Sequence, residues 1–237
     1  MRDTSQWRPL ALGLGTLLPA LLFVSWLYPP TRALWDGLDQ AAFWAMNRSL
    51  AEGRWWQGFW AIANNRAFDL VAAGGMSAVF AHYVLTHDRR HLRYFIAVGL
   101  MMSLTILIAM QIGKAIPIER PSATALYPEA LRLSQLVPQI PTKDVSGDSF
   151  PGDHGLVLLL FAGFILRYLP RGHGVLALVL AVLFTTPRLM SGAHWLSDEL
   201  VGALALGTLV LTWLFATPLH GWALKRIMGW IGDRGHP

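Results

Sequence analysis

Six apolar segments follow one another along this chain of 237 residues and restrict its fold more than any other feature. They lie at about Leu10–Tyr28, Ala67–Leu85, Tyr94–Ile112, Gly155–Leu169, Gly174–Thr186 and Leu196–Phe215. A transmembrane helix needs about 20 apolar residues to cross ~30 Å of hydrocarbon. The fourth and fifth segments are shorter, so we expect them to extend into their flanks or to cross a thinned bilayer. The pattern predicts an all-α, polytopic membrane bundle of six transmembrane helices.

The composition agrees with a membrane protein. Charged residues make up 14% of the chain, against about 25% in soluble domains. The chain has no cysteine, so neither a disulfide framework nor a thiolate metal site is available. A formal net charge of +5 suits membrane lipids with anionic headgroups or phosphorylated substrates. Because aromatic residues do not interleave with the basic ones as in a nucleic-acid groove, we expect no nucleic-acid partner.

The basic residues predict the orientation, because lysine and arginine stay on the cytoplasmic side of short loops. Ten of the nineteen lysine and arginine residues lie in the loops at 87–93 and 167–173 and near the two ends of the chain: Arg2, Arg8, Arg89, Arg90, Arg93, Arg167, Arg171, Lys225, Arg226 and Arg234. The first segment has no small-residue cleavage site, so we expect an uncleaved span. Both termini are then cytoplasmic, and segments 29–66, 113–153 and 187–195 of a single domain, 1–237, face outward.

The first outward segment is rich in aromatic and charged residues. Residues 31–66 are typical of an amphipathic helix that lies at a membrane interface. A packed cap over the bundle is the alternative. The tryptophans between Trp55 and Trp60 fit an interfacial belt better than a platform that stacks on a sugar.

A polar run, Arg188-x3-Gly192-x-His194-x3-Asp198, stands at the mouth of the last apolar segment. On a helix, His194 and Asp198 share a face, so the carboxylate can hold one imidazole nitrogen while the other attacks. Arg188 adds a fixed positive charge for phosphate oxygens. The run indicates phosphoryl transfer through a histidine.

The predicted topology brings further polar residues to the same face. His154, in SFPGDHG at 149–155, is a candidate general acid, and Arg120 and Lys114 join Arg188 as candidate phosphate ligands. Three cations can neutralise a phosphate, and the sequence has no H-E-x-x-H motif, so we expect neither a metal nor another cofactor. A lone H-x3-D pair is more often structural; the combination favours phosphoryl chemistry.

Three of these segments resemble the signatures of the type 2 phosphatidic acid phosphatase superfamily: Arg120-Pro121, Pro151-Gly152-Asp153-His154 and Arg188-x3-Gly192-x-His194-x3-Asp198. The resemblance implies a phosphohistidine intermediate at His194. Within the superfamily, residues 64–69, 141–155 and 186–198 resemble the lipid A phosphotransferases of the bacterial inner membrane, nearly end to end. This implies phosphate transfer from undecaprenyl pyrophosphate to lipid A on the periplasmic face, giving lipid A diphosphate and undecaprenyl phosphate.

The chain departs from the superfamily pattern twice. Five residues separate Lys114 from Arg120 where the pattern has six, which turns the lysine by about 100° on a helix. The second signature normally reads P-S-G-H, whereas Gly152 and Asp153 take the middle positions here. We expect both at the substrate phosphate. A carboxylate beside His154 should favour the protonated, acidic form of that histidine.

Polar residues outside the signatures allow two interpretations. Arg66 and Asp69 would be costly to bury at the edge of the second apolar segment, so they either pair with each other or face the site. Lys143 and Ser149 are possible substrate contacts. The other charged residues of the loop at 122–149 either bind a lipid headgroup or keep the loop solvated: Arg132, Asp144 and Asp148. We favour solvation.

Two other functions stay open. A hydrolase of the same superfamily would release phosphate from undecaprenyl pyrophosphate or phosphatidylglycerophosphate, because water can replace the lipid acceptor without a change of catalytic residue. A lipid carrier or flippase would bind the headgroup without chemistry. Such a protein would distribute its charges through the membrane depth, whereas this sequence gathers them at one face.

Overall fold

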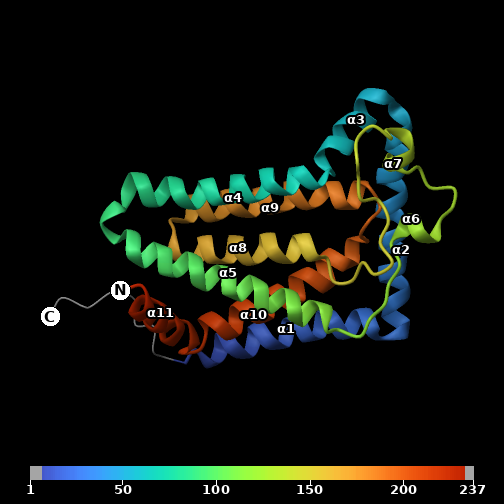
Figure 1. The fold of residues 1–237 in the computed structure, drawn as a ribbon. Coiled ribbons are helices and arrows are strands. Elements are labelled where there is room, and N and C mark those ends of the chain that lie inside the picture. Colours follow the sequence, from blue (N-terminus) through green and yellow to red (C-terminus); the bar gives the residue numbers. More distant parts are fainter. Residues whose placement is uncertain (1–6, 233–237) are drawn as a thin grey trace.

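The computed structural model describes residues 7–232, and every regular element within that range is a helix. The long helices run side by side (Figure 1): α1 (Pro9–Leu27), α4 (Arg66–His87), α5 (Leu92–Lys114), α8 (Asp153–Tyr168), α9 (Arg171–Met190) and α10 (Leu204–Phe215), which continues from the π-helix η3 (Asp198–Ala203). The all-α prediction is therefore confirmed. Arg2 and Arg234, which contributed to the predicted orientation, lie outside the described residues.

Five helices are long and apolar enough to cross a membrane: α1, α4, α5 with the preceding turn η2 (Arg89–His91), α9, and η3 with α10. The fifth predicted segment is longer than its apolar core at 174–186, because the helix includes its charged start at Arg171 and runs through Pro187 to Met190. The fourth stays short. With 16 residues, α8 covers about 24 Å and packs against α5, α9 and α10.

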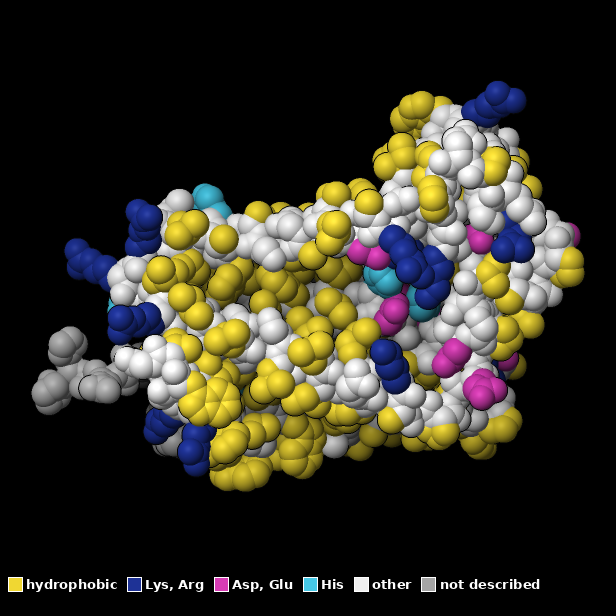
Figure 2. Space-filling view, in the orientation of Figure 1, with side chains coloured by type: hydrophobic (Ala, Val, Ile, Leu, Met, Phe, Trp, Pro, Cys, Tyr) yellow, Lys and Arg dark blue, Asp and Glu magenta, His cyan; other side chains and the backbone are white. Residues whose placement is uncertain are grey.

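The flanks of the long helices are covered with apolar side chains, while charges gather toward the two ends of the molecule (Figure 2). Leu10, Leu70 and Val182 are 75%, 76% and 68% exposed. Contact with water would cost roughly 25 cal/mol for every Å² of such surface. A hydrocarbon environment around these helices removes that cost.

Further helices cover the two ends of the bundle. At one end, α2 (Pro29–Ser49) lies across the long helices, accompanied by η1 (Leu50–Glu52), α3 (Arg54–Ala63), α6 (Ala123–Leu126) and α7 (Leu133–Leu136) (Figure 1). Asp39, Phe43 and Asn47 are the buried residues of α2. Residues 31–66 therefore form a packed cap, the alternative to a purely interfacial helix. At the opposite end lies α11 (Leu219–Trp230), which the sequence analysis did not predict.

A buried ion network joins the cap to the bundle. Asp39 accepts hydrogen bonds from Arg120 Nη2 at 2.6 Å, from the Ser197 backbone N–H at 2.7 Å and from Ser197 Oγ at 2.6 Å. Arg120 Nη1 donates to Asp198 Oδ1 at 2.6 Å. The side chains of Asp39 and Asp198 are 1% and 0% exposed, so α2, the loop at Arg120 and η3 are held by a charge cluster shielded from water.

We predict that Asp39→Ala destabilises the protein by about 3–5 kcal/mol, because it leaves three buried donors, Arg120 Nη2 and the backbone N–H and hydroxyl of Ser197, without their acceptor. Asp36→Ala is the matched control: Asp36 lies one turn earlier in α2 and pairs with Arg32 at the surface, where an ion pair contributes about 0–1 kcal/mol. Unfolding in mixed detergent micelles measures both. Equal stability of the two variants would contradict a stabilising network.

Candidate active site

His194 lies in a tight turn between α9 and η3. Gly192 adopts φ +73° in that turn, a conformation that glycine tolerates. A Cβ at this position would lie 2.7 Å from a methyl carbon of Thr124 and 2.8 Å from the Phe43 ring. The glycine of the polar run is therefore required by the backbone that carries His194, and not by contact with substrate.

The environment of His194 selects one ring nitrogen for chemistry. Nδ1 lies 2.8 Å from the Ser149 carbonyl oxygen, which can only accept, so Nδ1 carries the proton. Asp198, the predicted orienting residue, lies 3.8 Å from Nδ1 and accepts instead from the Trp195 backbone N–H at 2.7 Å. Asp198 thus acts on His194 by charge, while Ser149 fixes the tautomer and leaves Nε2 to react.

Negative groups hold His194 as an imidazolium. Burial would lower the pKa of this side chain, but the carboxylates of Asp153, Asp198 and Glu199 outweigh burial and raise the pKa from 6.5 to about 10. Asp153 Oδ1 stands 3.5 Å from Nε2. At neutral pH, Nε2 must therefore release a proton before it can attack a phosphate.

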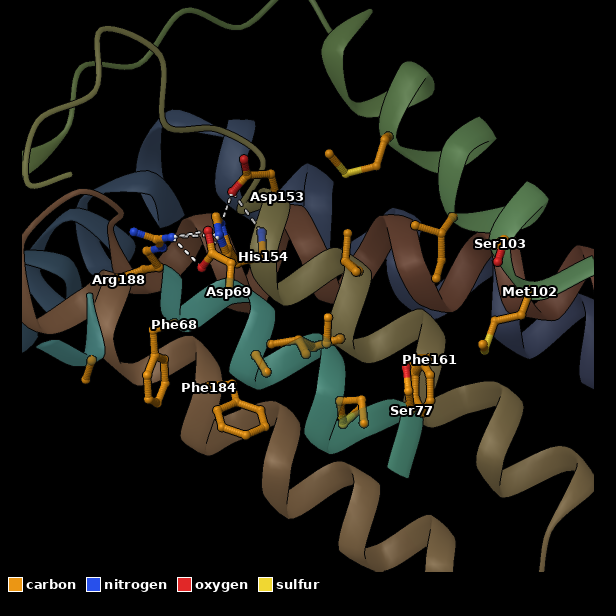
Figure 3. Close-up of a pocket in the computed structure, with 18 residues that line it drawn as sticks. Phe68, Asp69, Ser77, Met102, Ser103, Asp153, His154, Phe161, Phe184 and Arg188 are labelled. Carbon is orange, nitrogen blue, oxygen red and sulfur yellow. Dashed lines mark hydrogen bonds and ion pairs between the residues drawn. The ribbon is translucent and has the colours of Figure 1, made fainter. Parts of the chain in front are cut away.

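His154, in the first turn of α8, faces His194 across Asp153. Its Nδ1 lies 2.6 Å from Asp153 Oδ1, and its Nε2 lies 2.8 Å from Arg188 Nη2 and 3.2 Å from Asp69 Oδ1 (Figure 3). The structure thus brings together His194, His154, Asp153 and Arg188, which the sequence placed on one face. Asp153 is the residue that contacts both histidines.

Arg188 is buried, with 4% of its side chain exposed, and is held from two sides. Nη2 donates to both carboxylate oxygens of Asp69, at 2.7 and 3.0 Å. Nη1 donates to the backbone oxygen and Oδ1 of Asn64, at 3.2 and 2.8 Å. The interpretation that Asp69 pairs with Arg66 was wrong: Arg66 is exposed at the start of α4, whereas Asp69 faces the site.

The other two predicted phosphate ligands lie elsewhere. The guanidinium of Arg120 is occupied by Asp39, Ser197 and Asp198 in the buried network. Lys114 is exposed at the end of α5 and forms no ion pair with any described residue. Among residues 7–232, Arg188 is the cation that contacts a catalytic histidine candidate.

Gly152 and Ser149 have packing roles in this structure. The Gly152 N–H donates to the Asp198 carbonyl at 2.9 Å, and a Cβ at Gly152 would lie 2.3 Å from the Glu199 carboxyl. Ser149 Oγ donates to the Arg120 carbonyl at 3.0 Å. Both residues thereby position the backbone beneath His154 and His194.

The loop at 122–149 is less solvated than predicted. Asp144 is 3% exposed, pairs with Arg132 at 3.3 Å and accepts from the Ser134 N–H at 2.7 Å. It therefore fixes the loop internally. The carbonyl of Lys143 accepts from Asn64 Nδ2 at 2.9 Å, which links the loop to the residue that holds Arg188.

Three donor groups at the site are close enough to share a cation. Asp153, His154 and His194 each offer one ligand atom, and these atoms all lie within 4.8 Å of one another. Two imidazoles and a carboxylate suit a divalent transition metal. The geometry would therefore admit such an ion at the position where a phosphate must approach.

The sequence analysis missed Asp39, Asn64 and Glu199. Asp39 shares the i, i+4, i+8 face of α2 with Phe43 and Asn47, so its position among buried residues was a usable signal. Glu199 is 8% exposed, and neither carboxylate oxygen has a hydrogen-bond partner among the described residues. It directly follows Asp198, and an acidic residue inside an apolar segment should have attracted attention.

The raised pKa of His194 predicts a pH-dependent stability. A basic group whose folded pKa is raised stabilises the fold fully below its unfolded pKa, here about 6.5, and loses that contribution as the pH rises through about 10. A rise in pH from 7 to 10.5 should therefore lower the Tm of the wild type by at least about 3 °C more than that of His194→Gln. This difference corresponds to a loss of roughly 1 kcal/mol in the free energy of unfolding. Thermal unfolding in detergent measures both Tm values. Parallel curves would contradict the raised pKa.

Comparisons with known proteins agree with this geometry. Residues 94–221, which include His154, Arg188 and His194, match the PAP2 superfamily. The chain is 38% identical over 199 residues to "Lipid A 1-diphosphate synthase" of Escherichia coli (strain K12), covering 84% of each chain. It is 29% identical over 110 residues to "Putative undecaprenyl-diphosphatase YbjG" of the same organism, covering 46% of this chain and 50% of that protein.

No solved structure gives a significant match to this chain. The family match covers more than half of the chain, and the first relative aligns along most of both sequences. Together with the paired histidines and the arginine at one end of an apolar bundle, these matches identify the chain as a member of the PAP2 superfamily.

Proposed function

We propose that this protein is a membrane phosphotransferase that moves a phosphate from undecaprenyl pyrophosphate to lipid A, through a phosphohistidine at His194. The observation that carries the proposal is the position of His154, Asp153 and Arg188 at the end of an apolar cavity of about 420 Å³. The name of the first relative supports the acceptor, and the name of the second supports a diphosphate donor.

The cavity has the chemistry of a lipid site. Its polar end is formed by Asp69, Asp153, His154 and Arg188, and its remainder is lined by α4, α5, α8 and α9 with residues such as Met76, Met102 and Phe161 (Figure 3). Figure 2 shows a hollow with a hydrophobic floor that ends at histidine and charged side chains. A polyprenyl chain can lie along the floor while its phosphates reach His154 and Arg188 at the polar end.

The first half-reaction forms the phosphohistidine. His194 Nε2 passes its proton to an oxygen of the incoming phosphate and attacks the terminal phosphorus in line. The N–P bond forms as the bridging P–O bond breaks. His154 supplies a proton to the oxygen of the departing undecaprenyl phosphate, and Arg188 neutralises developing charge.

The second half-reaction is the reverse with a different lipid. A phosphate oxygen of lipid A attacks the phosphorus of the phosphohistidine, and the N–P bond breaks as the new P–O bond forms. His154 takes up any proton that the acceptor phosphate still carries, and lipid A diphosphate leaves His194 free. The donor and acceptor therefore use the site in turn, as in a ping-pong mechanism. We expect no cofactor, so a chelator should leave the transfer rate unchanged even though Asp153, His154 and His194 could hold an ion.

We further propose that six helices cross the bacterial inner membrane, with α8 as the short sixth span and with both termini in the cytoplasm. The basic loops at 87–93 and 167–173 support this orientation. They lie at the end of the bundle opposite to α2 and the site (Figure 1). The site would then face the periplasm, with the α2 and α3 segment at the outer interface.

Transfer is tested with donor labelled in its terminal phosphate, lipid A and purified protein. We expect the label on lipid A, and His194→Ala should reduce the rate at least about a thousandfold because it removes the nucleophile. Mass spectrometry of the lipid products measures this. Label that appears solely as free phosphate would establish a hydrolase instead, and full transfer by His194→Ala would exclude the phosphohistidine.

The cavity is tested by filling it. Ser77, on α4 two turns from Asp69, lines the cavity, so Ser77→Phe should raise KM for the full-length donor about tenfold, because displacing even part of one isoprene unit costs about 1.4 kcal/mol. A ten-carbon analogue should be affected less than about twofold. Ala78→Phe, an exposed position on α4 that does not line the cavity, is the control. Equal effects on both chain lengths would contradict this position for the donor tail.

A further inference from the structure

Asp153 places a carboxylate between the two histidines of the site. Its Oδ1 lies 2.6 Å from His154 Nδ1 and 3.5 Å from His194 Nε2. One donor atom from each of the three residues lies within 4.8 Å of the other two. Ligand atoms lie about 2.0–2.2 Å from a tetrahedral zinc ion and therefore about 3.4 Å from one another. The spacing of the three side chains is thus close to that of a metal site. The superfamily pattern has glycine in place of Asp153, so the third donor is a feature of this chain.

The second ring nitrogen of each histidine already faces an acceptor. His194 Nδ1 donates to the Ser149 carbonyl at 2.8 Å, which leaves Nε2 free. His154 Nε2 lies 3.2 Å from Asp69 Oδ1, so this nitrogen can donate while Nδ1 binds an ion. Arg188 Nη2, which lies 2.8 Å from the same nitrogen, then bonds to Asp69 alone. Histidines that bind metals almost always donate their other N–H to a carbonyl or a carboxylate, which orients the ring. The protein thus supplies the outer contacts of a metal site as well as its ligands.

The three ligands combine one fixed side chain with two adjustable ones. The side chain of His194 is 4% exposed, whereas those of Asp153 and His154 are 43% and 25% exposed. His194 therefore sets the position of an ion. The other two side chains can turn around it and widen the 2.6 Å contact between them to the distance between two metal ligands.

The surrounding charge favours a divalent cation. Glu199 is 8% exposed, and neither of its carboxylate oxygens has a hydrogen-bond partner among the described residues. Its carboxyl lies against Gly152 and Gly155, the two residues that flank the ligands of α8. Asp153 adds a second negative charge. An imidazolium at His194 compensates one of these two carboxylates, whereas a divalent ion compensates both, and an uncompensated buried charge is costly.

We propose that Asp153, His154 and His194 bind a divalent transition-metal ion of the zinc type, and that this ion inhibits the enzyme. In the bound state the lone pair of His194 Nε2 is donated to the metal and cannot attack phosphorus, and the proton of Nε2 passes to solvent. Two imidazole ligands select such an ion against Mg²⁺, which prefers oxygen. The ion is an inhibitor and not a cofactor, so the transfer proceeds without it. The inhibition rests on the proposed function in one respect, namely that His194 is the nucleophile; the binding does not.

Isothermal titration calorimetry with Zn²⁺ tests the site on the untagged full-length protein in detergent. We expect one Zn²⁺ ion to bind per chain, and Mg²⁺ in excess should not compete. Asp153→Asn should weaken Zn²⁺ binding at least about tenfold, because loss of even an outer contact of a metal site typically weakens binding roughly 10–100-fold. Asp153→Gly, which restores the residue of the superfamily pattern, decides the question in the same way if Asp153→Asn does not fold.

His82→Gln is the matched control, because His82 belongs to another group of histidines, at the end of the bundle opposite to the site (Figure 1). Its ring lies 6.1 Å from that of His87 and 6.3 Å from that of His173. The control should change the Zn²⁺ affinity less than about twofold. Equal affinities of the wild type and Asp153→Asn, or loss of binding in His82→Gln, would place the ion elsewhere and overturn the proposal. Competition by Mg²⁺ would mean a general attraction of cations and would overturn it too.

Inhibition is measured in the transfer assay. Zn²⁺ should halve the wild-type rate near the concentration at which it half-saturates the site in calorimetry, and a chelator should restore the rate. His82→Gln should be inhibited in the same way. Half-inhibition at a concentration unrelated to the binding constant would mean that Zn²⁺ acts on the diphosphate donor, and the inhibitory role of the site would be wrong.

These outcomes are separable from those of the proposed function. If the label reaches lipid A but Asp153→Asn binds Zn²⁺ as tightly as the wild type, the metal site is wrong and the transferase stands. If Asp153→Asn binds Zn²⁺ more weakly and the label appears solely as free phosphate, the metal site stands, because calorimetry uses no lipid and a metal on His194 Nε2 blocks either reaction.

Discussion

The cost of placing charge inside an apolar bundle governs the architecture around the site. Arg120, with 11% of its side chain exposed, lies between Asp39 and Asp198, and each of these carboxylates is completed by a backbone or hydroxyl donor. An unpaired charge at that depth would cost several kcal/mol. The network therefore requires α2, the loop before α6 and η3 to assemble together, and η3 begins four residues after His194.

Compensation of charge continues from this network into the reactive centre. His194 is faced by Asp153, Asp198 and Glu199, and Arg188 is held by Asp69, so each buried cation has at least one carboxylate beside it. In the absence of substrate, the acidic residues of the site thus neutralise the positive charges of His194 and Arg188. Asp69 thereby keeps the charge of Arg188 compensated in the absence of substrate.

The long helices were predictable because apolar length is a strong signal, and the six segments correspond to α1, α4, α5, α8, α9 and η3 with α10. The fifth segment extends into its flanks, which was one of the two expectations, but its end points at Arg171 and Met190 were not predicted, because charged residues close an apolar window before the helix ends. His154, His194, Asp153 and Arg188 were found through spacing. The partners of Arg120 and Arg188 were not, because Asp39 and Asn64 are distant in sequence and their contacts depend on how the cap folds back. Periodicity within one segment carries no information about such pairing between segments.

Glu199 packs against a segment that is more than forty residues away in the sequence. Its carboxyl occupies the space that a Cβ at Gly152 or at Gly155 would need. The serine that the superfamily pattern places at position 152 has no room while Glu199 keeps this conformation. We therefore expect changes at 152 and 199 to be non-additive, because a side chain at 152 fits once the Glu199 carboxyl turns away or is replaced by a smaller group.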